Sequence, residues 1–167
     1  MSKFKELCTA FKTAQGEFKN FQDDTYNFSV ELVEEFKSYF EVPESQFSLF
    51  KFNKKNEFNL VQPAIINALA LRPDSLWQFG VGLTVCNAPE TLPQELILIH
   101  IMIRRDLDGN FFLSHGNQAE PNEIPVEKKG KYNFVPFFDA LYETIINTHS
   151  QQMTHFIGQD TRRTIGY

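Results

Sequence analysis

The sequence predicts an α+β fold, in which an antiparallel meander of about five strands is flanked by two N-terminal helices and a C-terminal helix. Three observations support this: a helical apolar pattern at the start, alternating apolar patterns between residues 47 and 114, and a second helical pattern near the end. The strand patterns do not alternate with long helical patterns, so a parallel sheet is not indicated. Strands in series with helices on either side are typical of a sheet covered by helices on one face.

The first helix is expected from about Ser2 to Phe21, because apolar residues recur there at three- and four-residue intervals. Three of its phenylalanines are spaced seven residues apart, so they share one face of the helix. Side chains of this size must be buried against some surface. We therefore expect residues 1–21 to form an amphipathic helical arm. The apolar face consists of Phe4, Leu7, Phe11, Ala14, Phe18 and Phe21.

A second helix is expected from about Val30 to Phe40. Asp23 and Asp24 interrupt the apolar pattern of the first helix, which predicts a break there. Asn27 or Ser29 is suited to cap the second helix, since either side chain accepts a hydrogen bond from a free backbone N–H.

The first strands are short. Residues 47–52 alternate between apolar and polar side chains, and a polar turn at 53–56 leads back into a strand at 58–61. Residues 63–71 carry no clear period, and we assign them to a helical turn.

Two longer strands follow, each with one wholly apolar face. In residues 77–86 the opposite face is small or polar, and its glycines invite the close approach of another group. In residues 96–104 the opposite face carries Leu96, Leu98 and Met102, so we expect it to be partly covered. An Asp-Gly hairpin then leads into a strand at 111–114.

The last helix is expected over about residues 134–149, with Pro136 in its first turn, where the missing N–H costs nothing. Residues 1–149 are interpreted as a single α+β domain, and the tail, residues 150–167, is expected to dock on it.

Composition argues against several classes of protein. The 167 residues include 16 basic and 21 acidic side chains, a net charge of −5, so a nucleic-acid partner is not favoured. Cys8 and Cys86 form no CxxC pattern, which indicates neither a disulfide framework nor a zinc site and fits a reducing compartment. No cofactor motif and no apolar run long enough to span a membrane are found. We expect a cytoplasmic protein without a cofactor or metal.

Catalysis is an alternative hypothesis. His100 lies on a central strand, and a small hydrolase or nuclease would combine it with Asp106 and His115. The other interpretation of His100 is a structural histidine. Asp106 and Asp108 resemble the start of a calcium loop, but the closing glutamate is missing, so hairpin turn chemistry explains them better.

A second alternative is a single-stranded nucleic-acid binder. Lysines gather at two turns, where nearby aromatic rings such as Phe58 or Tyr132 offer stacking surfaces. Solvation of a hairpin tip or protection of a sheet edge is the simpler explanation. These lysines are Lys51, Lys54, Lys55, Lys128, Lys129 and Lys131.

The favoured hypothesis is a non-enzymatic protein-binding module: a regulator, an immunity-type inhibitor or a chaperone. It follows from the surplus of aromatic residues, 18 of them phenylalanines, and from the lack of an assembled catalytic set. The expected partner is another protein, and a second copy of the same chain, giving a homodimer, is one possibility. The residues expected to contact the partner are Phe4, Phe11, Phe18, Phe21, Leu96, Leu98 and Met102.

Overall fold

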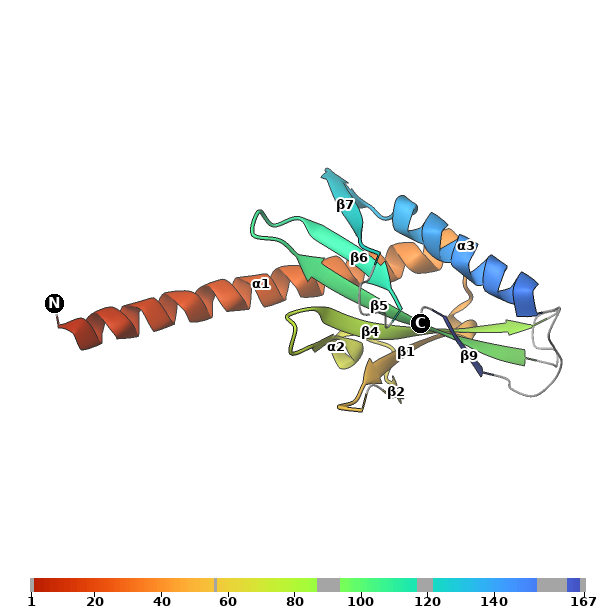
Figure 1. Cartoon of the computed structure of the whole chain (residues 1–167), viewed down its shortest axis with the longest axis horizontal. Helices are drawn as coiled ribbons and strands as arrows, with labels where there is room; N and C mark the ends of the chain where they lie inside the picture. The colour runs from red at the N-terminus through yellow and green to blue at the C-terminus, as the bar shows by residue number, and fades with distance from the viewer. Residues whose placement is uncertain (1, 56, 87–93, 117–121, 153–161, 166–167) are drawn as a thin grey trace.

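The computed structural model describes residues 2–55, 57–86, 94–116, 122–152 and 162–165. A long N-terminal helix, a largely antiparallel sheet and a C-terminal helix confirm the predicted α+β class (Figure 1). The helices are α1 (Lys3–Phe40), α2 (Ile65–Ala68) and α3 (Val135–Gln152), with a short 3-10 helix at Glu44–Gln46. The strands are β1 (Phe47–Phe52), β2 (Phe58–Val61), β3 (Ala70–Leu71), β4 (Trp77–Cys86), β5 (Gln94–Arg105), β6 (Phe111–His115), β7 (Ile124–Lys129), β8 (Lys131–Asn133) and β9 (Arg162–Ile165).

The sheet has more strands than the expected five. Its order is β2-β1-β4-β5-β6-β7-β8, with β3 paired to β4. The tail contributes β9, which pairs in parallel with the first half of β5. The predicted number of strands was too low because the additional strands are short or mostly exposed. In β7, for example, only Val126 is buried, so backbone pairing with β6 decides the strand without a strong apolar pattern.

The predicted break in the N-terminal helix is wrong, since α1 runs without interruption for 38 residues. Asp23 and Asp24 are exposed and leave the buried face of the helix intact. Ser29 does not cap a second helix. It is buried inside α1, where its hydroxyl donates to the carbonyl oxygen of Thr25 at 2.7 Å.

The core lies between the sheet and the two long helices. The second half of α1 inserts Phe28, Leu32 and Phe36, and α3 adds its own phenylalanines from the same side. The ring of Phe28 stacks on that of Phe111 in β6, with centroids 4.1 Å apart. Both predicted apolar strand faces belong to this core, so one face of the sheet is covered by helices. The strand residues are Trp77, Phe79, Val81, Leu83, Ile97, Ile99, Ile101 and Ile103.

The opposite face of the sheet is also covered in its central part. Leu98 and Met102 are buried there. The rings of Phe50 and Phe58 lie against β4, because a Cβ added to Gly80 would come within 2.8 Å of the Phe58 ring and 2.9 Å of Phe50 Cβ. The glycines of β4 therefore make room for aromatic side chains from β1 and β2, as the alternation in the sequence suggests.

Candidate interaction surface

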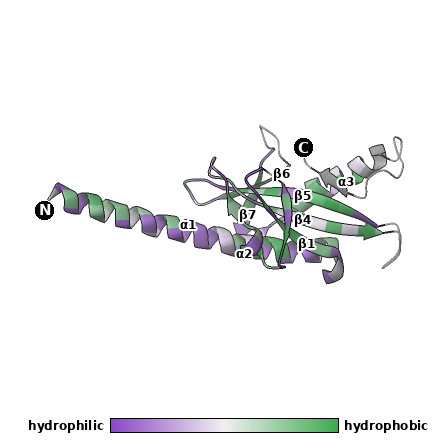
Figure 2. Cartoon of the chain, turned by 90° about the horizontal axis from the view of Figure 1, so that it is seen from below, coloured by the Kyte–Doolittle hydropathy of each residue, from purple (hydrophilic) through white to green (hydrophobic). Residues whose placement is uncertain are grey.

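The N-terminal half of α1 projects beyond the sheet as a free arm, which we define as residues 3–21 (Figures 1 and 2). Its first turn is capped by Ser2, whose hydroxyl oxygen accepts a hydrogen bond from the backbone N–H of Lys5 at 3.3 Å. At 1.5 Å per residue, the arm is about 28 Å long.

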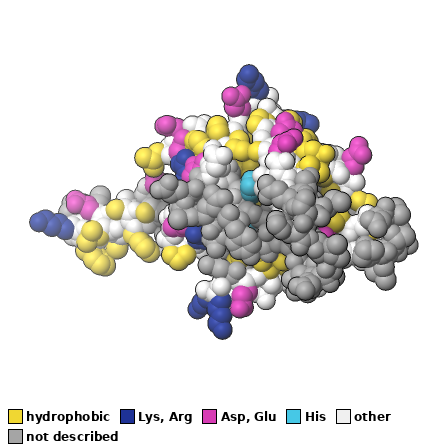
Figure 3. Space-filling model, turned by 45° about the vertical axis from the view of Figure 1, so that its right-hand side comes forward, with side chains coloured by type: hydrophobic (Ala, Val, Ile, Leu, Met, Phe, Trp, Pro, Cys, Tyr) yellow, Lys and Arg dark blue, Asp and Glu magenta, His cyan; other side chains and the backbone are white. Residues whose placement is uncertain are grey.

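The arm exposes large apolar side chains along one side. The exposed fractions are 72% for Phe4, 68% for Leu7, 64% for Phe11 and 50% for Phe18, against 1% for Phe28 further along the same helix. Hydrophobic side chains accordingly gather on the projecting end of the molecule (Figure 3). A row of exposed phenylalanines is unusual on the surface of a folded monomer, where large apolar patches commonly mark interaction sites.

The exposed row continues directly into the core. A series with seven-residue spacing starts at Phe4 and reaches Thr25 and Leu32, both of which are buried. A parallel series starts at Leu7 and reaches Phe28. Seven residues are close to two helical turns, so each series stays on one side of α1. We call the exposed part of this side the apolar stripe: Phe4, Leu7, Phe11, Ala14 and Phe18. The sheet covers this side of α1 from Thr25 onward and leaves the stripe uncovered.

The base of the arm is held against the sheet at Phe21, which is half-buried. Its ring lies 6.5 Å from that of Trp77, and the guanidinium of Arg105 lies 5.6 Å from its centroid. Arg105 also pairs with the Asp24 carboxylate at 3.1 Å. These contacts from β4 and β5 anchor the point at which the arm leaves the sheet.

The remaining residues expected to contact a partner lie elsewhere. Leu98 and Met102 are buried on the face of the sheet opposite α1, and Leu96 is half-buried. The Met102 sulfur lies 2.9 Å from Nη1 of Arg72, which donates to it. The structure therefore divides the seven residues into an exposed arm and an interior group, and it presents only the arm as a broad surface.

His100 is buried, with a hydrogen-bonding partner on one side and an aromatic ring on another. Its Nε2 lies 2.9 Å from the side-chain oxygen of Gln78, and its ring packs on Phe52 with centroids 4.0 Å apart. Burial, with a smaller effect from the positive charge of Arg72, lowers the pKa of His100 to about 4. The imidazole is thus neutral near pH 7.

The structure does not bring His100, Asp106 and His115 together. His115 pairs across the sheet with Ile101 and packs near Phe137, so it lies on the face covered by α3, opposite His100. Burial lowers the pKa of His115 as well. The proposed catalytic set is split between the two faces of the sheet and a hairpin turn.

Asp106 organises the turn between β5 and β6. Its Oδ1 accepts hydrogen bonds from the backbone N–H groups of Asn110 at 2.8 Å and Asp108 at 3.0 Å, and these bonds lower the pKa of its carboxyl group. Gly109 takes the left-handed conformation that the turn needs, with φ of 85°. Hairpin chemistry accounts for this segment. Within the described part of the chain, no cluster of His, Cys, Asp and Glu is arranged to hold a metal ion.

The two groups of lysines lie near opposite edges of the sheet. Lys51, Lys54 and Lys55 belong to β1 and its turn into β2, and the other group belongs to the β7–β8 hairpin. In the second group, Lys128 lies 4.7 Å from the ring centroid of Tyr132. Because β4, β5 and β6 separate the groups, they do not form one basic stacking surface.

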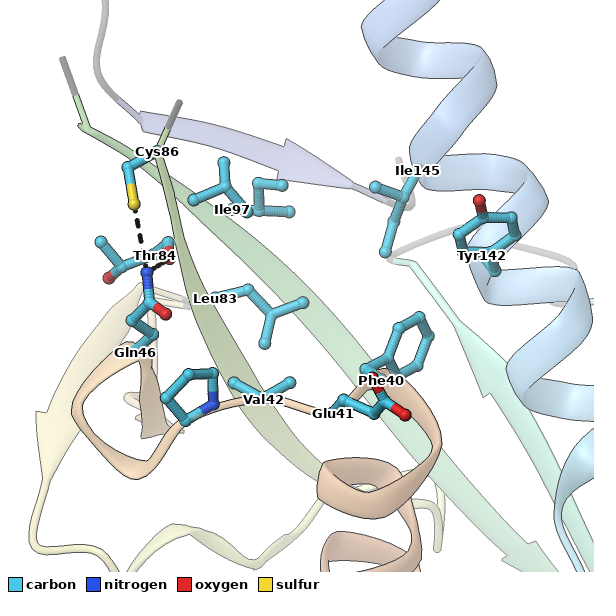
Figure 4. Close-up of a pocket in the computed structure, with 12 residues that line it drawn as sticks. Phe40, Glu41, Val42, Gln46, Leu83, Thr84, Cys86, Ile97, Tyr142 and Ile145 are labelled. Atoms are coloured by element: carbon cyan, nitrogen blue, oxygen red, sulfur yellow. Dashed lines mark hydrogen bonds between the residues drawn. The ribbon is translucent and has the colours of Figure 1, made fainter. Parts of the chain in front are cut away.

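A cavity of about 380 Å³ opens where α1 ends, between α3 and the strands β4 and β5 (Figure 4). Gln46 crosses one side of it, where its amide donates to the Thr84 carbonyl at 3.1 Å and to the Cys86 sulfur at 3.3 Å. No sequence pattern indicated this cavity, because its lining comes from segments up to about 100 residues apart. Its apolar lining consists of Phe40, Val42, Pro43, Leu83, Val85, Ile97, Tyr142 and Ile145.

In comparisons with known proteins, no family model matches the chain, and no curated protein or solved structure shows significant similarity to it. Among the described helices, none combines the length and the apolar character that crossing a membrane requires.

Proposed function

We propose that this protein is a non-enzymatic protein-binding module, a regulator, immunity-type inhibitor or chaperone, that holds its partner on the apolar stripe of α1. The observation that carries the proposal is the exposure of Phe4, Leu7, Phe11 and Phe18 on a helix that projects from the folded body. Helices that present apolar anchors at intervals of three, four and seven residues are a recurring means of protein recognition.

The positions of the histidines also support binding over catalysis. His100 is buried and His115 is half-buried. The two histidines lie on opposite faces of the sheet, each against an aromatic side chain. Cys8 and Cys86 are both free thiols, which agrees with the proposal of a reducing compartment such as the cytoplasm. The stripe, in contrast, offers a large apolar surface for a partner.

Site-specific photocross-linking tests the proposal. A photoreactive phenylalanine analogue is placed at position 11 of the full chain, and in a control chain it replaces Thr9, which faces away from the stripe. Both chains are expressed in cells of the source organism, and covalent adducts are identified by mass spectrometry. We expect a defined protein adduct from position 11 and none from position 9. Equal labelling from both positions, or no adduct at position 11, would contradict the proposal.

A further inference from the structure

We infer that the partner on the apolar stripe is a second copy of this chain, whose own arm lies antiparallel to the first. This inference rests on the proposed function and names its partner. Each arm then covers the stripe of the other, and the two folded bodies lie at opposite ends of the helix pair.

The position of the sheet determines the direction of the second arm. The side of α1 that carries the stripe is the side that the sheet covers from Thr25 onward. Two arms paired in parallel through their stripes would bring both sheets to the same end and onto the facing sides of the helices, where they would overlap. In the antiparallel arrangement, the tip of each arm stops near Phe21 of the other, where the sheet begins.

The apolar residues match in one antiparallel register across the whole arm. Two seven-residue series, one starting at Phe4 and the other at Leu7, alternate along the helix as in a coiled coil. In an antiparallel pair, a residue of one series faces a residue of the other. In the matching register, the residue numbers of two facing side chains add up to 25. Six layers of facing side chains then form along the helix pair, and the two central layers each place a large side chain against a small one. The facing residues are Phe4 with Phe21, Leu7 with Phe18, and Phe11 with Ala14.

The charges along the arm favour the same direction. The outer part, residues 3–12, has three lysines and one glutamate, a net charge of +2. Residues 17–24, which include the base of the arm and the first residues beyond it, have three acidic residues and one lysine, and one of the acidic residues, Asp24, is paired with Arg105. Antiparallel pairing places the basic tip of each arm beside the acidic base of the other, whereas parallel pairing would place like charges together. The charged residues are Lys3, Lys5, Glu6, Lys12, Glu17, Lys19, Asp23 and Asp24.

The surface available on the arm is close to the lower limit for a stable dimer. Each of the four large exposed side chains presents roughly 100 Å² of apolar surface, so two arms would bury roughly 800 Å² from these residues alone. With the polar flanks included, the total approaches the roughly 1,200 Å² at which stable interfaces begin. A second copy also explains how the arm keeps its helical form, since an unpaired helix of this length is marginal in water.

Analytical ultracentrifugation of the purified full chain tests the dimer. We expect a reversible monomer–dimer equilibrium, and Phe11→Asp should raise the dimer dissociation constant at least about 100-fold, because both copies lose a buried ring. Thr9→Asp, on the opposite side of the arm, is the matched control and should leave the constant unchanged. Both side chains are exposed in the single chain, so the circular dichroism of the folded body should be preserved. A monomer at all concentrations, or a dimer unaffected by Phe11→Asp, would overturn the inference.

Cross-linking tests the direction and register. Cys8 of one arm and position 15 of the other are neighbours in the proposed pair, whereas the two Cys8 residues are about 13 Å apart along the axis. The first chain keeps Cys8 and carries Cys86→Ser. The second chain is isotope-labelled and carries Cys8→Ser, Gln15→Cys and Cys86→Ser. The two chains are mixed and treated with a short bismaleimide. We expect a mixed dimer linked between positions 8 and 15. Thr13→Cys in place of Gln15→Cys, on the outer side of the arm, should give little product. A dimer without preference for position 15 would exclude the antiparallel register.

These results distinguish the inference from the proposed function. If the purified chain is monomeric but photocross-linking at position 11 captures a different protein, the inference fails and the proposed function stands. If neither a dimer nor a position-specific adduct is found, both fail.

Discussion

The imidazole of His100 and the side-chain amide of Gln78 form a buried pair that joins β5 to β4, with Nε2 of His100 2.9 Å from the amide oxygen. In the neutral imidazole, the Nε2–H donates to this oxygen. The ring of Phe52 packs on the imidazole, and both side chains of the pair are buried. His100 therefore joins two strands. Protonation at Nδ1 would keep this hydrogen bond but would place a positive charge in a buried site beside Arg72.

The stability of the protein should fall in mildly acidic solution because of His100. Its pKa is about 4 in the folded protein, and an unfolded chain has a histidine pKa of about 6.5. Below pH 6.5 the unfolded chain binds the proton more readily, so the free energy of unfolding should decrease as the pH falls from about 6.5 to 4, by on the order of 3 kcal/mol. Urea unfolding at a series of pH values measures this change.

His100→Gln is the matched variant for the pH prediction, because it keeps a side chain that can hydrogen-bond to Gln78 and removes the titrating group. Its free energy of unfolding should vary less with pH than that of the wild type. Burial also lowers the pKa of His115, which is still present in the variant. The free energy of unfolding of the variant should therefore keep a smaller decrease towards acidic pH. Identical pH profiles for the two proteins would show that His100 is not the source.

Two phenylalanines on the same side of α1 should differ sharply in their effect on stability. Phe28 is 1% exposed and stacks on Phe111, so Phe28→Ala should cost about 3–5 kcal/mol. Phe11 is 64% exposed, and Phe11→Ala should change the stability of the monomer by less than about 0.5 kcal/mol. Denaturant unfolding in dilute solution, where self-association is weakest, makes the comparison. A large loss for Phe11→Ala under those conditions would mean that the arm folds back onto its own body.

Replacing glycine by alanine should have opposite effects at two positions. At Gly80 the added Cβ would lie 2.8 Å from the Phe58 ring and 2.9 Å from Phe50 Cβ, so Gly80→Ala should destabilise the protein by about 1–3 kcal/mol. At Gly16, on the arm, nothing lies within 4 Å of the added Cβ, and Gly16→Ala should favour the helix by about 1 kcal/mol. Thermal unfolding reports the first change and far-ultraviolet circular dichroism reports the second. A stabilising Gly80→Ala would contradict the packing of the two rings on β4.

The local sequence pattern was sufficient to predict the structure of segments that have a regular apolar period or a recognisable turn sequence. The alternation in residues 77–86 and 96–104 predicted the two longest strands, and both are observed. The Asp-Gly turn at Asp106 and Gly109 is closed by bonds within five residues, so its conformation is encoded locally. Part of the helical turn assigned to residues 63–71 is present as α2, Ile65–Ala68, whereas Ala70–Leu71 forms β3.

The structure differs from the prediction where the conformation of a segment depends on contacts with residues far away in the sequence. Asp23 and Asp24 looked like a break, but α1 continues because Thr25 and Phe28 are held in the core. The strands β3 and β9 are short, and their pairing with β4 and β5 is visible only once those strands are in place.

The sequence alone determined that α1 has an apolar side, because that property depends only on residue spacing along a helix. It could not decide which part of that side is buried. Phe11 and Phe28 have the same local signal, and only the tertiary structure, by ending the sheet at the base of the arm, leaves one exposed and buries the other. In the same way, His100 and His115 are close in sequence, but the faces of the sheet on which they lie follow from strand register, which is set by contacts between strands.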